Sequence, residues 1–520
     1  MFSSFPPRHA LLLLALLFTP TARADSELHV RLKEFLGRPE YRHARWGMLI
    51  VDADTGKTVY QLNPDDLFAP ASVTKLYTCA AALVAFGPDY RFRTPVYRRG
   101  LVEDGTLKGD LILVAKGDPT MGGRTDAGGH LAFKDSDHTY ATFVSIVPEL
   151  TDTDPLAGLR SLARQIRQGG IRKVDGDVLI DDRLFAPSIG TGSGPKLVAP
   201  IMVNDNVVDV LISPAKAVGE RASVRQLPAN GFIDVDVQVE TVAADQKPNI
   251  TVELVGLGRY VIRGGIPLGS RPLVRICPVA DPELFARGLF IETLRREGVA
   301  VRASALSRPT APLPDKDAYA GMSRVAVLES PPFSELLKVI LKTSHNLHAS
   351  ALPLLIAAKY GQRTLPQGME LEAKILSELG VDVKSIALES GAGGGSADHV
   401  TPRTTVQLLL ALRRRSDFEA VRSALPVLGV DGTLAGVLPK DSPAYGKVQA
   451  KTGTYIDNDL LNARTYLRSK SLAGLMTTKS GRNLVFALFI NDVLLPPGVD
   501  SRREGKLLGR LCERIYEDTP

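Results

Sequence analysis

Ser72 and Lys75 lie three positions apart at the start of an apolar, alanine-rich run that continues to Val84 and ends at Gly87. The run has helical length and spacing, so we expect both side chains on one face of a helix start. A serine hydroxyl needs a base to take its proton, and a lysine can be that base when burial or a nearby cation lowers its pKa. The pair is a candidate nucleophile and base, although this spacing also occurs by chance on many helices.

A second hydroxyl stands beside a carboxamide in the sequence Ser344-His345-Asn346. These residues follow a predicted helix that begins after Pro332, and a further helical pattern starts directly behind them. They therefore lie at a helix junction. Alone, the three residues predict no activity.

A third group, Lys451-Thr452-Gly453-Thr454, ends a β-branched strand near the C-terminus. Glycine in a strand lets another backbone or a substrate approach closely, and lysine and hydroxyl side chains can hold a carboxylate. The tetrapeptide is common by itself. Taken in this order, at a helix start, a helix junction and a strand, the three groups match a signature shared by β-lactamases and penicillin-binding proteins.

The residue pattern of the segments that must position these groups changes along the chain, and so does the secondary structure that it predicts. Residues 46–51 and 57–62 predict a hairpin, residues 72–84 a buried helix, and residues 96 to 320 mostly short β-branched runs. Helices and then strands follow. The predicted helices are 333–342, 345–359, 367–379, 404–414 and 502–516, and the predicted late strands are 446–452, 472–478 and 484–490. A mixed domain interrupted by a long insertion fits this order and the length of 520 residues.

The chain resembles the low-molecular-mass class C penicillin-binding proteins of peptidase family S13, D-alanyl-D-alanine carboxypeptidases that also act as endopeptidases. Supporting segments are 109–111, 116–119, 176–177, 181–182, 204–206, 400–402 and 429–434. The resemblance implies an α/β (α+β) fold with a penicillin-binding transpeptidase/β-lactamase-like domain built from residues 25–95 and 322–520. Residues 96–321 would then be the long, mainly β inserted region. No cofactor is implied.

The same resemblance implies the catalytic roles. Ser72 would attack the carbonyl of the penultimate D-alanine, with Lys75 as its general base, and Ser344 would relay a proton to the departing amine. Water would then release the acyl group, which completes a two-step hydrolysis. The backbone N–H groups of Ser72 and Thr454 would form the oxyanion hole.

It also implies how the substrate is held. Asn346 would bind the substrate backbone, and Lys451 would supply positive potential. Thr452 and Thr454 would bind the terminal carboxylate, and Gly453 would allow the close approach. The expected partners are peptidoglycan stem peptides and cross-links, with β-lactam antibiotics as covalent inhibitors.

Two features depart from the family pattern. The family usually has an Asp-Gly-Ser-Gly-Leu-Ser-Arg type of loop before Val-Thr-Pro, whereas this chain has a glycine-rich stretch from Ser390 to Asp398 with few polar side chains. The substrate contacts that the family makes at this loop are therefore not expected to carry over as they stand. The stretch from Tyr455 to Lys470 is also longer than expected between the third motif and the next strand, which predicts a remodelled cleft rim.

The first residues predict export. Arg8 and His9 precede an apolar run, and Ala22-Arg23-Ala24 suits signal cleavage, so residues 1–24 are predicted to be a signal peptide without a later membrane anchor. The location would be periplasmic, envelope or extracellular. Removing this segment takes away two arginines and no acid, which leaves +4 of the formal +6. Without dense basic runs, this mild excess argues against nucleic-acid binding.

Three places suggest other chemistries. His345 and His348 suggest a metal pair, but no carboxylate or further histidine stands nearby at ligand spacing, so we predict no metal. The glycines from 391 to 395 lack the ending of a phosphate-binding loop. Cys79 lies along the apolar helix and is expected to be a buried small hydrophobe; with Cys277 and Cys512 it allows at most one disulfide.

Two alternative functions remain at this point. A β-lactamase shares the acylation groups, but residues 347–450 contain no Glu-x-x-Leu-Asn motif of the kind that class A lactamases use. A non-catalytic peptidoglycan-binding relative is the other alternative, and the three intact motifs argue against it.

Overall fold

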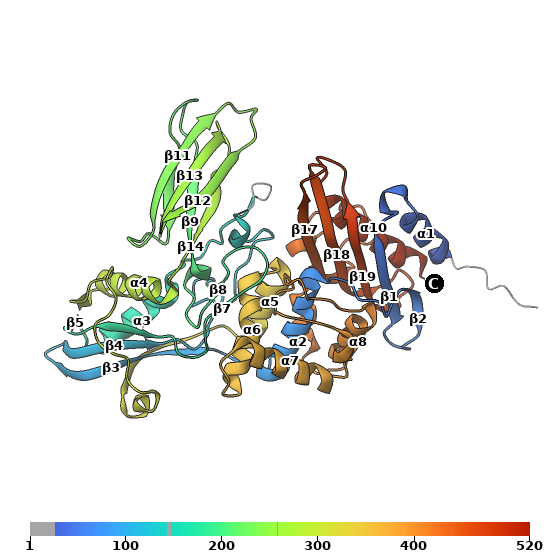
Figure 1. Ribbon diagram of the computed structural model, residues 1–520. Coiled ribbons are helices and arrows are strands. Elements are labelled where there is room, and N and C mark those ends of the chain that lie inside the picture. Colours follow the sequence, from blue (N-terminus) through green and yellow to red (C-terminus); the bar gives the residue numbers. More distant parts are fainter. Residues whose placement is uncertain (1–26, 143–146, 257, 520) are drawn as a thin grey trace, which may run out of the picture.

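A computed structural model describes residues 27–142, 147–256 and 258–519 (Figure 1). The predicted signal peptide, residues 1–24, lies outside the described residues. Within the described part, no helix combines the length and apolar character that a membrane span requires.

Five antiparallel strands form the sheet that carries the third motif. Side chains alternate between its faces, so that Met48 and Ile50 pack against α1 and α10, whereas Leu49 and Val51 pack against α2 and α8. The two ends of the described chain thus share one core. The strand order is β17 (Val448–Asp459), β18 (Arg464–Thr477), β19 (Asn483–Leu494), β1 (Arg45–Asp52) and β2 (Thr58–Leu62).

Helices cover both faces of this sheet. On one face lie α1 (Glu27–Leu36) and α10 (Arg502–Asp518); on the other lie α2 (Thr74–Phe86), α5 (Phe333–Thr343), α6 (Asn346–Lys359), α7 (Leu365–Glu378), α8 (Pro402–Arg413) and α9 (Phe418–Ala424). The central helix α2 is buried from Thr74 to Leu83, which explains why most of its residues are apolar.

Between α2 and α5 the described residues build four more sheets. A six-stranded sheet contains β3 (Arg93–Glu103), β4 (Thr106–Val114), β5 (Lys173–Val174), β6 (Val178–Asp181), β15 (Ala300–Val301) and β16 (Ser323–Glu329). Two three-stranded sheets contain β9 (Val207–Ser213), β10 (Ser223–Leu227) and β14 (Leu273–Pro278), and β11 (Asp234–Val242), β12 (Asn249–Gly256) and β13 (Arg259–Pro267). Strands β7 (Ser188–Ile189) and β8 (Leu197–Val198) pair with each other. Figure 1 shows this part lying beside α5 and α6.

Short 3-10 turns connect these elements at Pro39–Tyr41, Ala71–Val73, His138–Tyr140, Asn204–Asn206, Lys316–Gly321, Val383–Ser385 and Gly432–Leu434. The mixed helix and strand content confirms the predicted fold class. Because β16 pairs with β3 inside the six-stranded sheet, the structure favours a division near residues 92 and 330. The boundaries at 95 and 321 stay a prediction.

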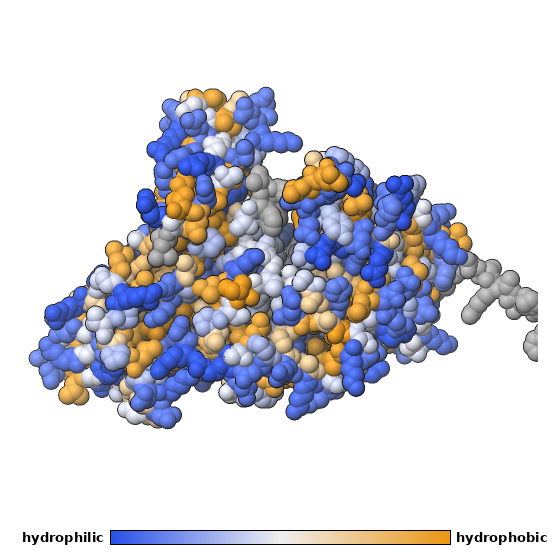
Figure 2. All heavy atoms as spheres, in the orientation of Figure 1, coloured by the Kyte–Doolittle hydropathy of each residue, from blue (hydrophilic) through white to orange (hydrophobic). Residues whose placement is uncertain are grey.

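Three elements differ from the sequence-based expectation. Helices α3 (Ala157–Gln168) and α4 (Pro282–Arg296) pack on the six-stranded sheet within a region expected to be mostly β. The stretch 455–470, expected to be a connection, is mostly strand, because β17 and β18 continue as a long hairpin. Figure 2 shows an apolar patch over the tip of this hairpin, where Leu460 and Leu461 are 87% and 92% exposed.

Candidate active site

The three motifs predicted from the sequence meet at one place. The ammonium group of Lys75 donates to Ser72 Oγ at 2.9 Å, to Asn346 Oδ1 at 2.8 Å and to the carbonyl of Ala392 at 2.6 Å. The ammonium group of Lys451 donates to Ser344 Oγ at 2.9 Å. The fold therefore brings side chains from α2, the α5–α6 junction and β17 together at this place.

Ser72 lies in the 3-10 turn that leads directly into α2. Its side chain is half-buried, whereas Lys75, one turn further on, has no exposed surface. Burial lowers the pKa of Lys75 to about 7, and Cys79 and Asp398 oppose this only in part. Among the described residues, no carboxylate lies within ion-pair distance of this ammonium group. The lysine can therefore be neutral near physiological pH.

The second motif bends sharply between two helices. Ser344 has a left-handed backbone (φ 63°) at the end of α5, and the ring of His345 accepts a hydrogen bond from the backbone N–H of His348 at the start of α6. This bend turns Ser344 Oγ toward Lys451. Burial and the neighbouring Lys75 hold the pKa of Lys451 well below its ordinary value.

Gly453 brings β17 close to the nucleophile. A Cβ at this position would lie 2.4 Å from the carbonyl oxygen of Pro70 and 3.1 Å from the nitrogen of Ser72, so any larger residue would push the strand away. Thr452 donates its hydroxyl proton to Thr433 Oγ1 at 2.7 Å, and Thr454 is exposed. The predicted oxyanion hole lies along this approach.

Residues of the inserted part also hold the second motif, which the sequence did not predict. The amide of Asn346 donates to the carbonyl and the hydroxyl of Ser193, both at 3.1 Å, and Tyr140 donates to the carbonyl of Ser344 at 2.7 Å. Ser193 lies in a glycine-rich loop whose Thr191 hydroxyl contacts Ser390 Oγ at 2.7 Å. Nothing in the spacing of these residues indicates this role.

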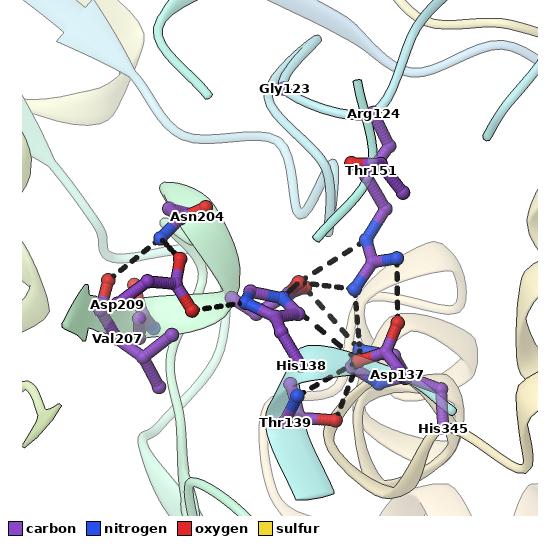
Figure 3. A network of polar contacts seen from close by, with 12 residues as sticks. Gly123, Arg124, Asp137, His138, Thr139, Thr151, Asn204, Val207, Asp209 and His345 are labelled. Carbon is purple, nitrogen blue, oxygen red and sulfur yellow. Dashed lines mark hydrogen bonds and ion pairs between the residues drawn. The ribbon is translucent and has the colours of Figure 1, made fainter. Parts of the chain in front are cut away.

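Behind this bend lies a buried network of charged side chains (Figure 3). The guanidinium of Arg124 bridges Asp137 at 2.8 Å and Asp205 at 2.6 Å. The ring of His138 lies between Asp205 at 2.8 Å and Asp209 at 2.7 Å. Burial works against the charged ring, but Asp209 and its neighbours outweigh it and raise the pKa of His138 well above its ordinary value. Carboxylates thus face both ring nitrogens, which favours the charged form of His138.

This network corrects one sequence-based statement. A carboxylate does stand beside the histidine pair, because Asp205 Oδ1 lies 3.5 Å from His345 Nε2 and 2.5 Å from His348 Nε2. The fold brings Asp205 to His348 across 143 positions of the sequence. The guanidinium of Arg124 also faces this ring, with Nη2 3.3 Å from His345 Nε2, and its positive charge disfavours a metal cation at this place. These contacts favour a hydrogen-bonded network, and the absence of a metal stays a prediction.

The altered glycine-rich loop contributes backbone rather than side chains. The carbonyl of Ala392 accepts from Lys75, and a Cβ at Gly393 would lie 2.0 Å from the carbonyl of Ala71, so glycine is required there. Asp398 accepts the N–H groups of Glu389 and Gly395, which closes the loop. The loop thus supports the lysine although it lacks the family's polar side chains.

The three cysteines are buried and unpaired, so the disulfide that the sequence allowed does not form. Burial raises the pKa of Cys79 to about 12, which makes its thiol a poor nucleophile. Its place in the core around α2 agrees with a small buried hydrophobe.

Comparisons with known proteins give one consistent family. The model of the D-Ala-D-Ala carboxypeptidase 3 (S13) family matches residues 28–506. A D-alanyl-D-alanine carboxypeptidase from Actinomadura sp. is 29% identical over 85% of this chain and 80% of its own length. D-alanyl-D-alanine carboxypeptidase DacB from Haemophilus influenzae is 25% identical over 86% of this chain and 85% of its own length.

A solved structure agrees in fold. The crystal structure of penicillin binding protein 4 (dacB) from Haemophilus influenzae superposes with a TM-score of 0.70 at 23% identity, covering 94% of this chain and 99% of that one. The family match spans nearly all of the described residues and all three motifs. This chain therefore belongs to the D-Ala-D-Ala carboxypeptidase 3 (S13) family.

Proposed function

We propose that this family member is a serine D-alanyl-D-alanine carboxypeptidase that hydrolyses peptidoglycan peptides through an acyl-enzyme at Ser72. The observation that carries the proposal is the setting of Lys75, which touches the Ser72 hydroxyl and only neutral acceptors. A neutral lysine takes the serine proton as Oγ attacks the carbonyl carbon of the penultimate D-alanine. The oxygen of that carbonyl then becomes an anion, which backbone N–H groups stabilise.

The leaving D-amino acid needs a proton on its amine. Ser344 Oγ stands beside Lys451, at 2.9 Å, and is the group best placed to pass that proton on. The burial of Lys451 makes proton transfer between the two easier, because its ammonium form is disfavoured. The C–N bond breaks as the proton arrives, and water later attacks the ester to release Ser72.

The binding roles follow from the same geometry. Asn346 presents its amide from the start of α6 and would hold the substrate backbone, for which its N–H bonds to Ser193 must be exchanged. Lys451 lies behind Ser344 and donates to its hydroxyl at 2.9 Å, while Thr452 and Thr454 flank Gly453 on β17. Endopeptidase cleavage of cross-links would use the same groups, since the bond cleaved is the same in kind.

The place of action is part of this proposal. A signal-like segment precedes the described residues, and peptidoglycan lies outside the cytoplasmic membrane, so we infer export to the periplasm or envelope. The Haemophilus influenzae protein has also been solved with a β-lactam. We infer that β-lactams acylate Ser72 here as well.

The test is the intact mass of the protein after incubation with penicillin. A persistent adduct of one penicillin supports a carboxypeptidase-type enzyme, rapid turnover without adduct supports a β-lactamase, and no reaction supports a non-catalytic relative. Ser72→Ala removes only a hydroxyl, so it should fold like the parent and form no adduct. An adduct that survives in this variant would place the nucleophile elsewhere.

A further inference from the structure

Strand β18 places a lysine directly opposite the last residue of the third motif. Lys470 pairs in register with Thr454 across β17 and β18, so the two side chains share one face of the sheet. The ammonium group of Lys470 donates to Thr454 Oγ1 at 2.8 Å. No pattern in the sequence marked this residue.

Within the described part of the chain, Lys470 forms no ion pair. Its nearest acids are Glu504 and Asp500, and neither is within ion-pair distance of its nitrogen. Glu504 is held by Arg503 at 2.6 Å, and Asp500 by Arg502 at 2.6 Å. The lysine therefore offers its positive charge to the third motif.

Helix α10 leaves room for this ammonium group. A Cβ at Gly505 would lie 3.3 Å from Cε and 3.5 Å from Nζ of Lys470, which is tight contact, so glycine lets the side chain pass between α10 and the sheet. The lysine is half-buried there and reaches the exposed Thr454 at the sheet edge.

The bond to Lys470 also fixes the direction of the Thr454 hydroxyl. A hydroxyl has one O–H and two acceptor positions, and an ammonium group can only donate. Thr454 therefore accepts from the lysine and keeps its own proton for another acceptor. Thr452 differs, because it already donates to Thr433 at 2.7 Å. Of the two motif hydroxyls, Thr454 is the one with a proton available.

We propose that Lys470 is a positioning and specificity residue, which orients the Thr454 hydroxyl and supplies positive charge for the free α-carboxylate of the leaving D-amino acid. The inference rests on the proposed function and deepens it by naming the substrate feature that is recognised. A carboxylate accepts the Thr454 proton and is attracted by the ammonium group behind it, whereas a carboxamide gains only the neutral hydrogen bond. A substrate ending in D-alanyl-D-alanine is therefore preferred over its C-terminal amide.

The test compares two peptides that differ only at this group, one ending in D-alanyl-D-alanine and one in D-alanyl-D-alaninamide. Lys470→Met should lower kcat/KM for the carboxylate peptide by about tenfold or more, mainly through KM, because a charge-assisted interaction is lost. The amide peptide should change by no more than about twofold, since it gains little from the charge. Lys470→Arg should restore the preference for the carboxylate.

Two controls separate this role from a structural one. Lys506→Met removes a lysine from the exposed side of α10 and should leave both peptides unaffected, which excludes a general effect of net charge. Burial lowers the pKa of Lys470 to about 8, so the preference of the parent should fall as pH rises above that value, while Lys470→Arg should keep it. Glu504 and Asp500, the acids that face Lys470, are each paired with an arginine, and the hydrogen bond to Arg502 lowers the pKa of Asp500.

Two outcomes overturn the inference. If Lys470→Met lowers kcat/KM equally for both peptides, the lysine is structural. If the parent has the same kcat/KM for both peptides, no carboxylate is recognised. The proposed function fails in a different way, when the parent forms no penicillin adduct. A parent that acylates without preferring the carboxylate would leave the function standing and remove only the role of Lys470.

Discussion

Two groups of buried cations flank the second motif, and they differ in what surrounds them. Lys75 and Lys451 contact hydroxyl, amide and carbonyl oxygens. Arg124 contacts two carboxylates, and His138 contacts Asp205 and Asp209 closely and Asp137 at 3.9 Å. Burial lowers the pKa of both lysines, whereas the carboxylates outweigh burial and raise the pKa of His138.

The difference explains how one fold contains both a base and a scaffold. A buried ammonium group without an acid loses its hydration and gains little in return, so its neutral form is favoured. A buried guanidinium with two acids remains charged and links the elements that hold those acids. Excluding carboxylates from the first group is thus what makes Lys75 reactive.

The largest effect is expected from Lys75→Arg, which puts a permanent cation, like Arg124, in the place of the base. Arginine keeps the positive charge but is not deprotonated in proteins, so it cannot take the Ser72 proton. Acylation by penicillin should fall by about 10²- to 10⁴-fold. In the parent, acylation should rise with pH through a single ionisation near 7, because only the neutral lysine is a base.

The measurement is the rate of adduct formation by intact mass, with circular dichroism to show that the variant is folded. A folded arginine variant that acylates at the parent rate would mean that Lys75 is not the base.

The second prediction breaks the scaffold. Asp205→Asn removes the carboxylate that Arg124 and His138 share and leaves both cations short of a partner. Breaking a buried pair in this way costs about 3–5 kcal/mol, so the free energy of unfolding should fall by about that amount. Denaturant unfolding measures it.

A surface pair is the matched control. Asp65 binds Arg403 with Oδ1 2.5 Å from Nε, but both side chains are largely exposed, at 67% and 41%. Asp65→Asn should therefore cost less than about 1 kcal/mol. Equal losses for Asp65→Asn and Asp205→Asn would show that the buried network contributes no more than a surface pair.

How far the sequence predicts this arrangement differs between the two groups. The lysines belong to short motifs with fixed neighbours, so the residue pattern alone predicts Ser72, Lys75 and Lys451 as site residues, and the fold brings them together. The network depends on contacts between distant segments: Asp205 meets His348 across 143 positions. No local pattern records such a contact, because each residue is ordinary in its own segment.

The missed helices have a different cause. In α3 the apolar residues Leu159, Leu162, Ala163 and Ile166 recur at helical spacing and are all buried, so the signal was present. The surrounding β-branched runs concealed it. In α4, buried residues occupy most of the helix and leave no clear stripe, so its period was not visible. Likewise β18 begins before its apolar part, with Arg464 and Thr465 in the hairpin.

The third prediction places a carboxylate beside the base. Asn346→Asp keeps the shape of the side chain but puts a charge where Lys75 now meets a neutral oxygen at 2.8 Å. An opposite charge at this distance raises a lysine pKa by about 1–3 units. Acylation at pH 7 should fall by about 10- to 100-fold and recover as pH rises. A pH–rate profile with an unchanged midpoint would contradict the comparison between the two groups.

The smallest effect is expected at a buried carboxyl group without a cation, the counterpart of Lys75 in opposite charge. Glu372 on α7 accepts a hydrogen bond from Thr78 at 3.0 Å, and its second oxygen has no partner. Burial raises its pKa from 4.5 to about 8.

A raised folded-state pKa means that the contribution of Glu372 to stability is present below pH 4.5 and is lost as pH rises through about 8. Glu372→Gln keeps the neutral form at every pH, so it should match the parent near pH 4.5 and exceed it by about 2 kcal/mol at pH 6, because the parent loses about 1.4 kcal/mol per pH unit between the two pKa values. Unfolding by denaturant at both pH values measures this, with the exposed Glu378→Gln on the same helix as control. If the advantage of Glu372→Gln did not grow with pH, the carboxyl group would be ionised in the folded protein, and burial without a counter-charge would not be enough to neutralise a group in this core.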